Sequence, residues 1–504
     1  MYALKDLMHL VTRHKRKELS IIGYDMADNN YELFYHKIEK GDFATDDDAA
    51  AYFFGPDKNG QYTQYKNLKN RFFRRLTNAV FHLDLKKPEF NEAQVGFYNC
   101  WKNLASVKIM GARGAMHAAE RLAKITLRAS EKFEVVGVTL ELARVLRTYY
   151  TYYKPDNRKR NHYEEILNKS LEAYQLEVRS ESMYTSLIAP YILSRSRKPW
   201  ICERANACLQ ELAPHFGKIQ SYRFNFYYYL IKRLECEVRF DYPGVVEVSR
   251  EALEHFKKKD STPKTTFAIF GNSLLIGLTM IGEHEEAEQV AGTSLTMVEK
   301  YSVGWYKTNE MYMTLKLYKK DYQEACTILN KAVHHRRFKN LPPAERESWK
   351  IYEGFLQLLI LAKKIKQTDG DKKRSKFRPA RFLNEVPNFS KDKRGMNIPV
   401  LITHIIYLLY EKRYVESYDR MLALEKYNSR HLKEGDDTFR TYCFIKALLQ
   451  IQKADFKRSE SEKRATGCLA RMSSQPVQYL NAPHEVETIP YEHLWELAME
   501  AISQ

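Results

Sequence analysis

Two short polar corners, Gly282-Glu-His-Glu-Glu-Ala287 and Lys320-Asp-Tyr-Gln-Glu-Ala325, lie within the stretch from Phe267 to Phe338 that decides the fold. Each corner follows an apolar helical pattern and leads into a second helix that carries alanine near its start. Ala287 and Ala325 are 38 residues apart. A small residue at the same point of successive units lets neighbouring helices approach closely. The stretch therefore predicts two consecutive hairpins of a stacked helical repeat.

The same pattern extends in both directions along the chain. Further corners are predicted at Lys412–Ser417 and Ala454–Ser459, whose serines are 42 residues apart. Tetratricopeptide units repeat at about 34 residues, so these units are looser and only similar to that repeat. We therefore predict an all-α fold, an α-solenoid of TPR-like hairpins with a repeat of 38 to 42 residues, preceded by a small helical module.

Earlier hairpins are predicted from apolar periodicity. Val135–Tyr153 should pair with Tyr163–Leu176, and Met183–Leu193 should form a separate helix that pairs with Trp200–Phe216. At the other end, Ile489–Ile502 reads as a closing helix with Pro490 at its start. The predicted domains are residues 1–90, 91–364, 365–398 and 399–504.

Residues 1–90 form the predicted N-terminal module. Thr45 precedes three aspartates at the position of an N-cap, and the helix that follows should end near Gly55. A long helix from Tyr62 to about Leu85 carries the candidate nucleic-acid-binding residues: Lys66, Lys69, Arg71, Arg74 and Arg75. A short acid-capped helix followed by a basic helix is compatible with a helix-turn-helix-like module. The alternative is a capping domain whose exposed face is merely basic.

Composition agrees with an all-α solenoid. The chain of 504 residues is 44% hydrophobic, with only 20 Gly and 16 Pro, too few for the turns of a large all-β protein. The formal net charge of +18 indicates either an anionic partner or simply many solvated lysines. The seven cysteines are dispersed, which is typical of buried thiols in a reducing compartment. No secretion signal is recognisable, and the apolar run Phe267–Ile281 is short and contains polar residues, so we predict a buried repeat helix and a cytoplasmic protein.

The most basic window is the predicted insertion at 365–398. Lys363 to Arg394 contains 12 Lys or Arg against four acids, with glycines and prolines that argue against one long helix. The window is either an arm that contacts phosphates or an acidic protein, or a solvated loop. The candidate partner-binding residues in it and in the adjoining hairpin are Arg378, Arg381, Lys393, Arg394 and Arg440.

Unusual sequence phrases mark the C-terminal third, including Pro387-Asn-Phe-Ser-Lys-Asp-Lys-Arg-Gly-Met-Asn-Ile-Pro399 and Glu487-Thr-Ile-Pro-Tyr-Glu-His-Leu-Trp495. Together with Thr45-Asp-Asp-Asp-Ala-Ala50, they resemble a family of uncharacterised bacterial proteins of about this length. The resemblance covers most of the chain and implies no activity and no site.

Catalytic and metal-binding signatures are missing from the sequence. There is no C-x-x-C pair, no H-E-x-x-H, no P-loop and no G-x-S-x-G, so we expect no metal site, no cofactor and no enzymatic activity. His334-His335-Arg336-Arg337 fits the C-terminal turn of a helix better than a metal site.

Two functions remain open. The first is a non-enzymatic scaffold that holds a protein partner in the concave surface of the solenoid, helped by the basic insertion. The second is a nucleic-acid-binding regulator that uses the basic N-terminal helix, with the solenoid as a sensor or oligomerisation arm. A third, an enzyme with a site that no motif reveals, would require a cluster of His, Cys or carboxylate groups in a cleft.

Overall fold

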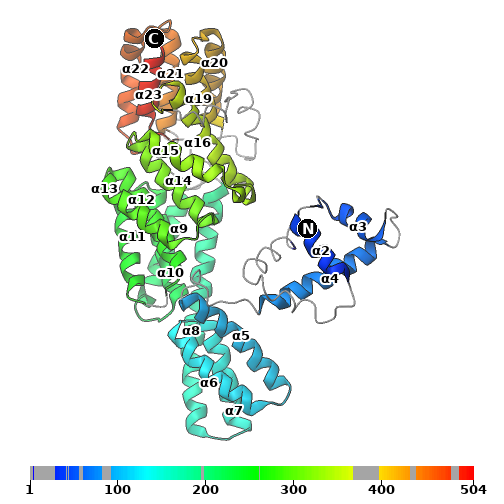
Figure 1. The fold of residues 1–504 in the computed structure, drawn as a ribbon. Coiled ribbons are helices and arrows are strands. Elements are labelled where there is room, and N and C mark those ends of the chain that lie inside the picture. The colour runs from blue at the N-terminus through cyan, green and yellow to red at the C-terminus, as the bar shows by residue number, and fades with distance from the viewer. Residues whose placement is uncertain are drawn as a thin grey trace. The chain divides into compact units, whose positions relative to one another are not determined.

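The computed structural model describes residues 4, 29–40, 42–43, 45–55, 61–81, 92–193, 198–259, 262–366, 397–431, 439–477, 487 and 489–503. These residues form α-helices and two short 3-10 turns and contain no strand, which confirms the predicted all-α fold (Figure 1). The chain divides into two compact units, Met1–Ser130 and Glu131–Gln504. The predicted boundary between residues 90 and 91 lies outside the described residues and stays a prediction.

The N-terminal module packs three helices around an aromatic core. These helices are α2 (Asn29–Lys40), α3 (Asp46–Phe54) and α4 (Gln61–Val80). The ring of Phe34 meets the rings of Tyr65 and Phe72 edge-on, with centroids 6.0 and 5.3 Å apart. The predicted cap of α3 is confirmed: the Asp48 N–H donates to the Thr45 hydroxyl, and the Thr45 N–H donates to the Asp48 carboxylate.

The hairpin that follows in the first unit consists of α5 (Glu92–Ala112) and α6 (Met116–Lys132). The second unit is a succession of helices in which neighbours along the chain pack on one another. They are α7 (Val136–Tyr152), α8 (Asn157–Leu193), α9 (Lys198–Leu212), α10 (Tyr222–Val238), α11 (Tyr242–Lys257), α12 (Lys264–Ile281), α13 (His284–Met297), α14 (Val303–Tyr318), α15 (Tyr322–Val333), α16 (Pro343–Leu361), α19 (Asn397–Tyr410), α20 (Tyr414–His431), α21 (Phe439–Lys453), α22 (Arg458–Ser473) and α23 (Tyr491–Ala501).

One corner geometry recurs between the helices of a hairpin. The first helix ends at a residue in the left-handed conformation, and the next N–H donates to the carbonyl five positions back, as Glu283 does to Leu278 at 2.9 Å. That same residue is the N-cap of the second helix. The left-handed residues are Gly114, Phe240, Gly282, Lys320 and Lys412, and the residues five positions later, all buried, are Ala119, Val245, Ala287, Ala325 and Ser417.

This geometry explains the predicted alanines. With only two or three residues between the two helices, the first turn of the second helix packs against the end of the first, which favours a small side chain such as alanine, although Val245 takes this place after Phe240. The prediction for the last corner is corrected: Ser459 is exposed, and the buried residue is Ser461, 44 positions after Ser417. The reason is that both Asp455 and Phe456 are left-handed, which lengthens this corner.

The helix α8 differs from the prediction. Tyr163–Leu176 and Met183–Leu193, expected as separate helices, belong to one helix of 37 residues. The residues between them include no glycine or proline, and the single proline of α8, Pro190, lies in its last turn. The two pairings themselves hold, because α8 packs on α7 as well as on α9 and α10.

The long apolar helix α12 is a core helix. Among the described helices it alone has the length and composition of a membrane span, and most of it is buried. It packs against α11, α13 and α14. The approach to α11 is close, since a Cβ added at Gly277 would lie 2.8 Å from the Val246 side chain. Packing among helices therefore accounts for its composition, as the sequence predicted.

The C-terminal helix α23 does not simply close the stack. It packs against α19 and α21. Glu496 pairs with Lys320 at the α14–α15 corner, at 2.6 Å, and Glu500 pairs with Lys364 beyond the end of α16, at 2.9 Å. The helix therefore folds back along the stack and joins corners that lie more than a hundred residues earlier in the sequence.

Candidate functional site

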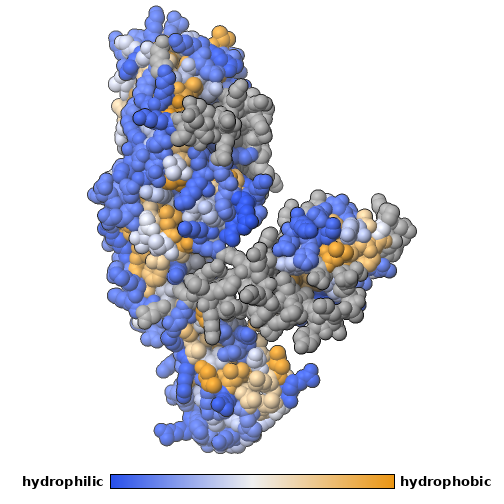
Figure 2. All heavy atoms as spheres, in the orientation of Figure 1, coloured by the Kyte–Doolittle hydropathy of each residue, from blue (hydrophilic) through white to orange (hydrophobic). Residues whose placement is uncertain are grey.

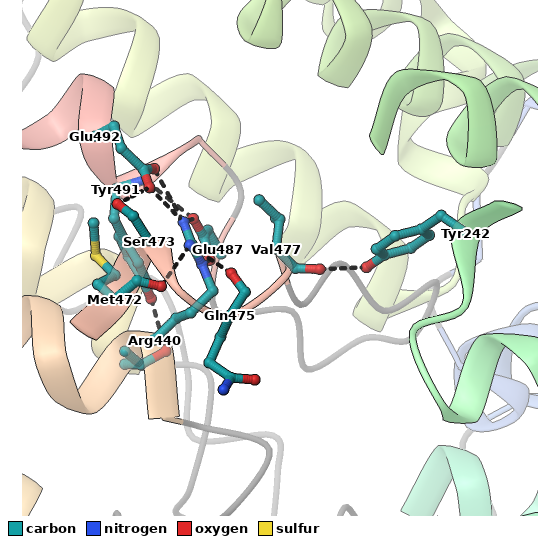
Figure 3. Close-up of polar contacts among 10 residues, drawn as sticks. Tyr242, Arg440, Met472, Ser473, Gln475, Val477, Glu487, Tyr491 and Glu492 are labelled. Carbon is teal, nitrogen blue, oxygen red and sulfur yellow. Dashed lines mark hydrogen bonds and ion pairs between the residues drawn. The ribbon is translucent and has the colours of Figure 1, made fainter. Parts of the chain in front are cut away.

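Arg440, predicted as a partner-binding residue, is buried on α21. Its Nε and Nη2 donate to the two oxygens of Glu487, at 2.9 and 2.8 Å, and Nη2 also donates to Glu492 at 2.9 Å (Figure 3). Its Nη1 donates to the carbonyls of Met472 and Gln475. The Arg440 side chain is only 3% exposed.

The chemistry of this cluster is structural. Burial alone would lower the pKa of Arg440, but the hydrogen bonds and charges of Glu487 and Glu492 outweigh burial and raise it. The guanidinium therefore stays charged and directs its N–H groups to partners inside the protein. Nearby, the Tyr242 hydroxyl donates to the Val477 carbonyl at 2.5 Å, which links the start of α11 to the segment after α22 (Figure 3). Arg440 thus anchors this segment, and we withdraw it from the partner-binding set.

The other predicted partner-binding residues lie outside the described residues. They are Arg378, Arg381, Lys393 and Arg394, all in the insertion. Their role stays a prediction.

The predicted nucleic-acid-binding residues on α4 fall into two groups. Lys69 donates to Asp46 at 2.8 Å, and the Arg75 guanidinium lies 4.2 Å from the ring centroid of Tyr31. Both side chains therefore hold α4 to its neighbours. The remaining cations are exposed and have no ion-pair partner among the described residues: Lys66, Arg71 and Arg74.

The Asp46 carboxylate holds the Lys69 side chain in place. It also accepts a hydrogen bond from the Tyr65 hydroxyl at 2.6 Å. Partial burial alone would raise the pKa of Asp46, but the hydrogen bonds from Lys69 and Tyr65 outweigh burial and lower it. The carboxylate is therefore ionised at neutral pH and ties the first turn of α3 to the middle of α4.

Polar side chains connect the first helices of successive hairpins in the second unit. Between α8 and α10, Arg223 and Tyr227 both donate to Glu181, at 2.7 and 2.9 Å. Between α10 and α12, Arg233 donates to Ser273 at 2.8 Å. We call these residues, with the neighbouring Tyr184 and Glu237, the first-helix row: Glu181, Tyr184, Arg223, Tyr227, Arg233, Glu237 and Ser273.

The row is fixed at one end and exposed at the other. Arg233 is buried and pairs with Glu237 at 3.2 Å, whereas the Arg223 and Glu181 side chains are 44% and 39% exposed. Beside the row, Glu177 is buried and accepts a hydrogen bond from Ser221 at 2.5 Å. Burial raises the pKa of Glu177 to about 7.

The first helices α14 and α16 are connected in the same way. The hydroxyls of Thr314 on α14 and Tyr352 on α16 lie 3.0 Å apart, and within α14 Lys307 pairs with Glu310 at 3.0 Å. Burial and the nearby Glu310 raise the pKa of Glu345, opposed by Lys307. Hydrogen bonds between polar side chains therefore connect the first helices of several neighbouring hairpins.

The surface also has a hydrophobic area over α5 (Figure 2). Phe97, Trp101 and Ile109 are 38%, 47% and 64% exposed there. The Phe97 ring contacts both Trp101 and its neighbour Tyr98. Nothing in the described structure covers these side chains.

The described part of the chain does not support a metal site or a reactive thiol. It contains no group of three or more His, Cys, Asp or Glu residues that could hold a metal ion. All seven cysteines are free thiols. Burial raises the pKa of Cys100 to about 11 and that of Cys236 to about 12, so both are protonated at neutral pH.

The chain matches no protein-family model, no curated protein and no solved structure. The resemblance drawn from the sequence therefore stays a prediction.

Sequence reasoning missed the first-helix row. The contacts between its helices join residues 40 or more positions apart, as Glu181 with Arg223 and Arg233 with Ser273, and no local motif joins them. The only signal is a polar residue inside an otherwise apolar repeat helix, as Ser273 is in α12. Such a residue needs a partner when it is buried, and the partner comes from the next hairpin.

Proposed function

We propose that this chain is a non-enzymatic helical-repeat scaffold that binds a protein partner along the first helices α8, α10, α12 and α14. The observation that carries the proposal is the exposed end of the first-helix row. Arg223, Glu181 and Tyr227 are held by one another in fixed positions and still face solvent. A partner that meets such pre-ordered polar groups loses less side-chain entropy on binding.

The insertion supplies a second predicted contact through Arg378, Arg381, Lys393 and Arg394. Arg440 is left out of the proposed contact, because its donors are engaged inside the protein. The partner is expected to present both acidic and hydrogen-bonding groups, since the exposed end of the row offers a guanidinium, a carboxylate and a phenol.

The test compares two charge reversals of matched arginines. Arg223 pairs with Glu181 at 2.7 Å on the first helices, and Arg250 pairs with Glu286 at 2.6 Å between the second helices α11 and α13. Their side chains are 44% and 52% exposed. Tagged wild type, Arg223→Glu and Arg250→Glu are captured from native cell extract after nuclease treatment.

The proposal predicts a stoichiometric protein with wild type and Arg250→Glu that is lost with Arg223→Glu. Equal retention by both variants would place the binding surface elsewhere. Absence of any stoichiometric protein from the wild-type capture, at low and at moderate salt, would contradict the scaffold function itself.

A further inference from the structure

The outer face of α4 is chemically uniform. At about 100° per residue, an arc of about 140° lies opposite the buried stripe formed by Leu68, Phe72 and Leu76. Every side chain on this arc is a cation, an amide or a hydroxyl: Thr63, Lys66, Asn67, Asn70, Arg71, Arg74, Thr77 and Asn78.

Among the described residues of the module, the cations on this arc have no ion-pair partner. Asp46 is engaged by Lys69 and Tyr65, and Asp48 is held in the cap of α3. The helix α4 itself has no acidic residue. Lys66, Arg71 and Arg74 therefore project a positive field from about 12 Å of one helix, and no acid of that helix opposes it.

We propose that the outer face of α4 binds duplex DNA, with Lys66, Arg71 and Arg74 on phosphates and the asparagines beside them at the base edges or sugars. This inference is independent of the proposed protein-binding function, because it concerns the other unit of the chain. Arginine and asparagine are the side chains that hydrogen-bond base edges and phosphates most readily. An α-helix also fits the major groove, which is about 12 Å wide.

Charge and shape favour duplex DNA over other anionic ligands. A membrane-surface helix turns its apolar face to the lipid, but the apolar face of α4 is buried against α2 and α3. Single strands bind in basic grooves lined with stacking aromatic rings. The α4 face is convex, and the two exposed aromatic rings of the helix, Tyr62 and Phe73 at 49% and 39%, lie beside the arc and line no groove in the described part of the chain.

The test measures binding of the full chain to a labelled duplex of about 20 base pairs, roughly two helical turns. Fluorescence anisotropy is recorded over a range of salt concentrations. The test variant is Lys66→Ala/Arg71→Ala/Arg74→Ala. The control removes the same charge from exposed positions on α11, α12 and α22, as Lys257→Ala/Lys264→Ala/Lys463→Ala. Circular dichroism checks that both variants keep the helical content of wild type.

The test variant is expected to lose at least about tenfold in affinity at low salt, and its salt slope should fall by about 2 to 3, close to one for each phosphate contact removed. The control should bind like wild type. No duplex binding by wild type, or equal losses in both variants, would overturn the proposal. Tighter binding to a single strand, to polyglutamate or to anionic lipid vesicles than to the duplex would overturn the choice of ligand.

Discussion

Arg440 and the cations of α4 have the same charge in opposite surroundings. Arg440 is buried, and its donors are taken by Glu487, Glu492 and two carbonyls. Lys66, Arg71 and Arg74 face solvent without an ion-pair partner among the described residues. A basic residue in a helical repeat therefore either holds the fold or is available to a partner, and burial together with pairing decides which.

The largest expected effect is the loss of stability when the buried Arg440 is replaced. Arg440→Met leaves Glu487 buried without its partner, and we expect the free energy of unfolding to fall by about 3 to 5 kcal/mol. The measurement is urea denaturation followed by circular dichroism. Arg413→Met is the matched control, since Arg413 pairs with Glu411 and Glu416 on the surface. A loss for Arg440→Met no larger than for the control would contradict the structural role of Arg440.

A buried acid that has no directly paired cation should give the opposite result, because its replacement should stabilise the protein. Glu177→Gln is expected to stabilise the protein, because the folded-state pKa of about 7 lies above the ordinary value of 4.5. Folding therefore favours the protonated form of Glu177. The loss in the free energy of unfolding that its ionisation causes grows as pH rises from about 4.5 to about 7, and it reaches at most about 3 kcal/mol above that range.

The corresponding measurement is the denaturation midpoint of Glu177→Gln and wild type at pH 5 and at pH 8. The rise in the midpoint caused by Glu177→Gln should be larger at pH 8. Glu181→Gln serves as the exposed control. The groups nearest to Glu177 are Ser221, Arg223, Glu134 and Glu181. An equal gain at both pH values would show that Glu177 does not titrate in this range.

The smallest expected effect lies within α4. Lys69→Met removes the ion pair with Asp46 and should weaken the N-terminal module by about 1 kcal/mol, whereas Lys66→Met should change its stability by less than about 0.5 kcal/mol. Hydrogen exchange of peptides from α3 reports the difference directly. Similar exchange rates in the two variants would show that the paired Lys69 contributes no more to the stability of the module than the exposed Lys66.

The sequence predicts the helices better than it predicts which cations are free. Apolar periodicity and the alanines at 287 and 325 are local signals, and they led correctly to the all-α stack and its corners. The joined helix α8 and the extra left-handed residue at Phe456 were not predicted, because the residues between the two expected halves of α8 carry no stop signal and the local sequence does not mark Phe456 as left-handed. The role of Arg440 was not predicted because its partner Glu487 lies 47 residues away in the sequence, beyond α22.

The central claim is that a protein partner binds along the first helices of the stack. Hydrogen exchange of the captured, nuclease-treated complex, compared with the free chain, tests it most directly. We expect slower exchange in peptides from α8, α10, α12 and α14, with α11, α13 and α15 unchanged. Protection confined to α11, α13 and α15, or protection of no helix in this unit, would contradict it.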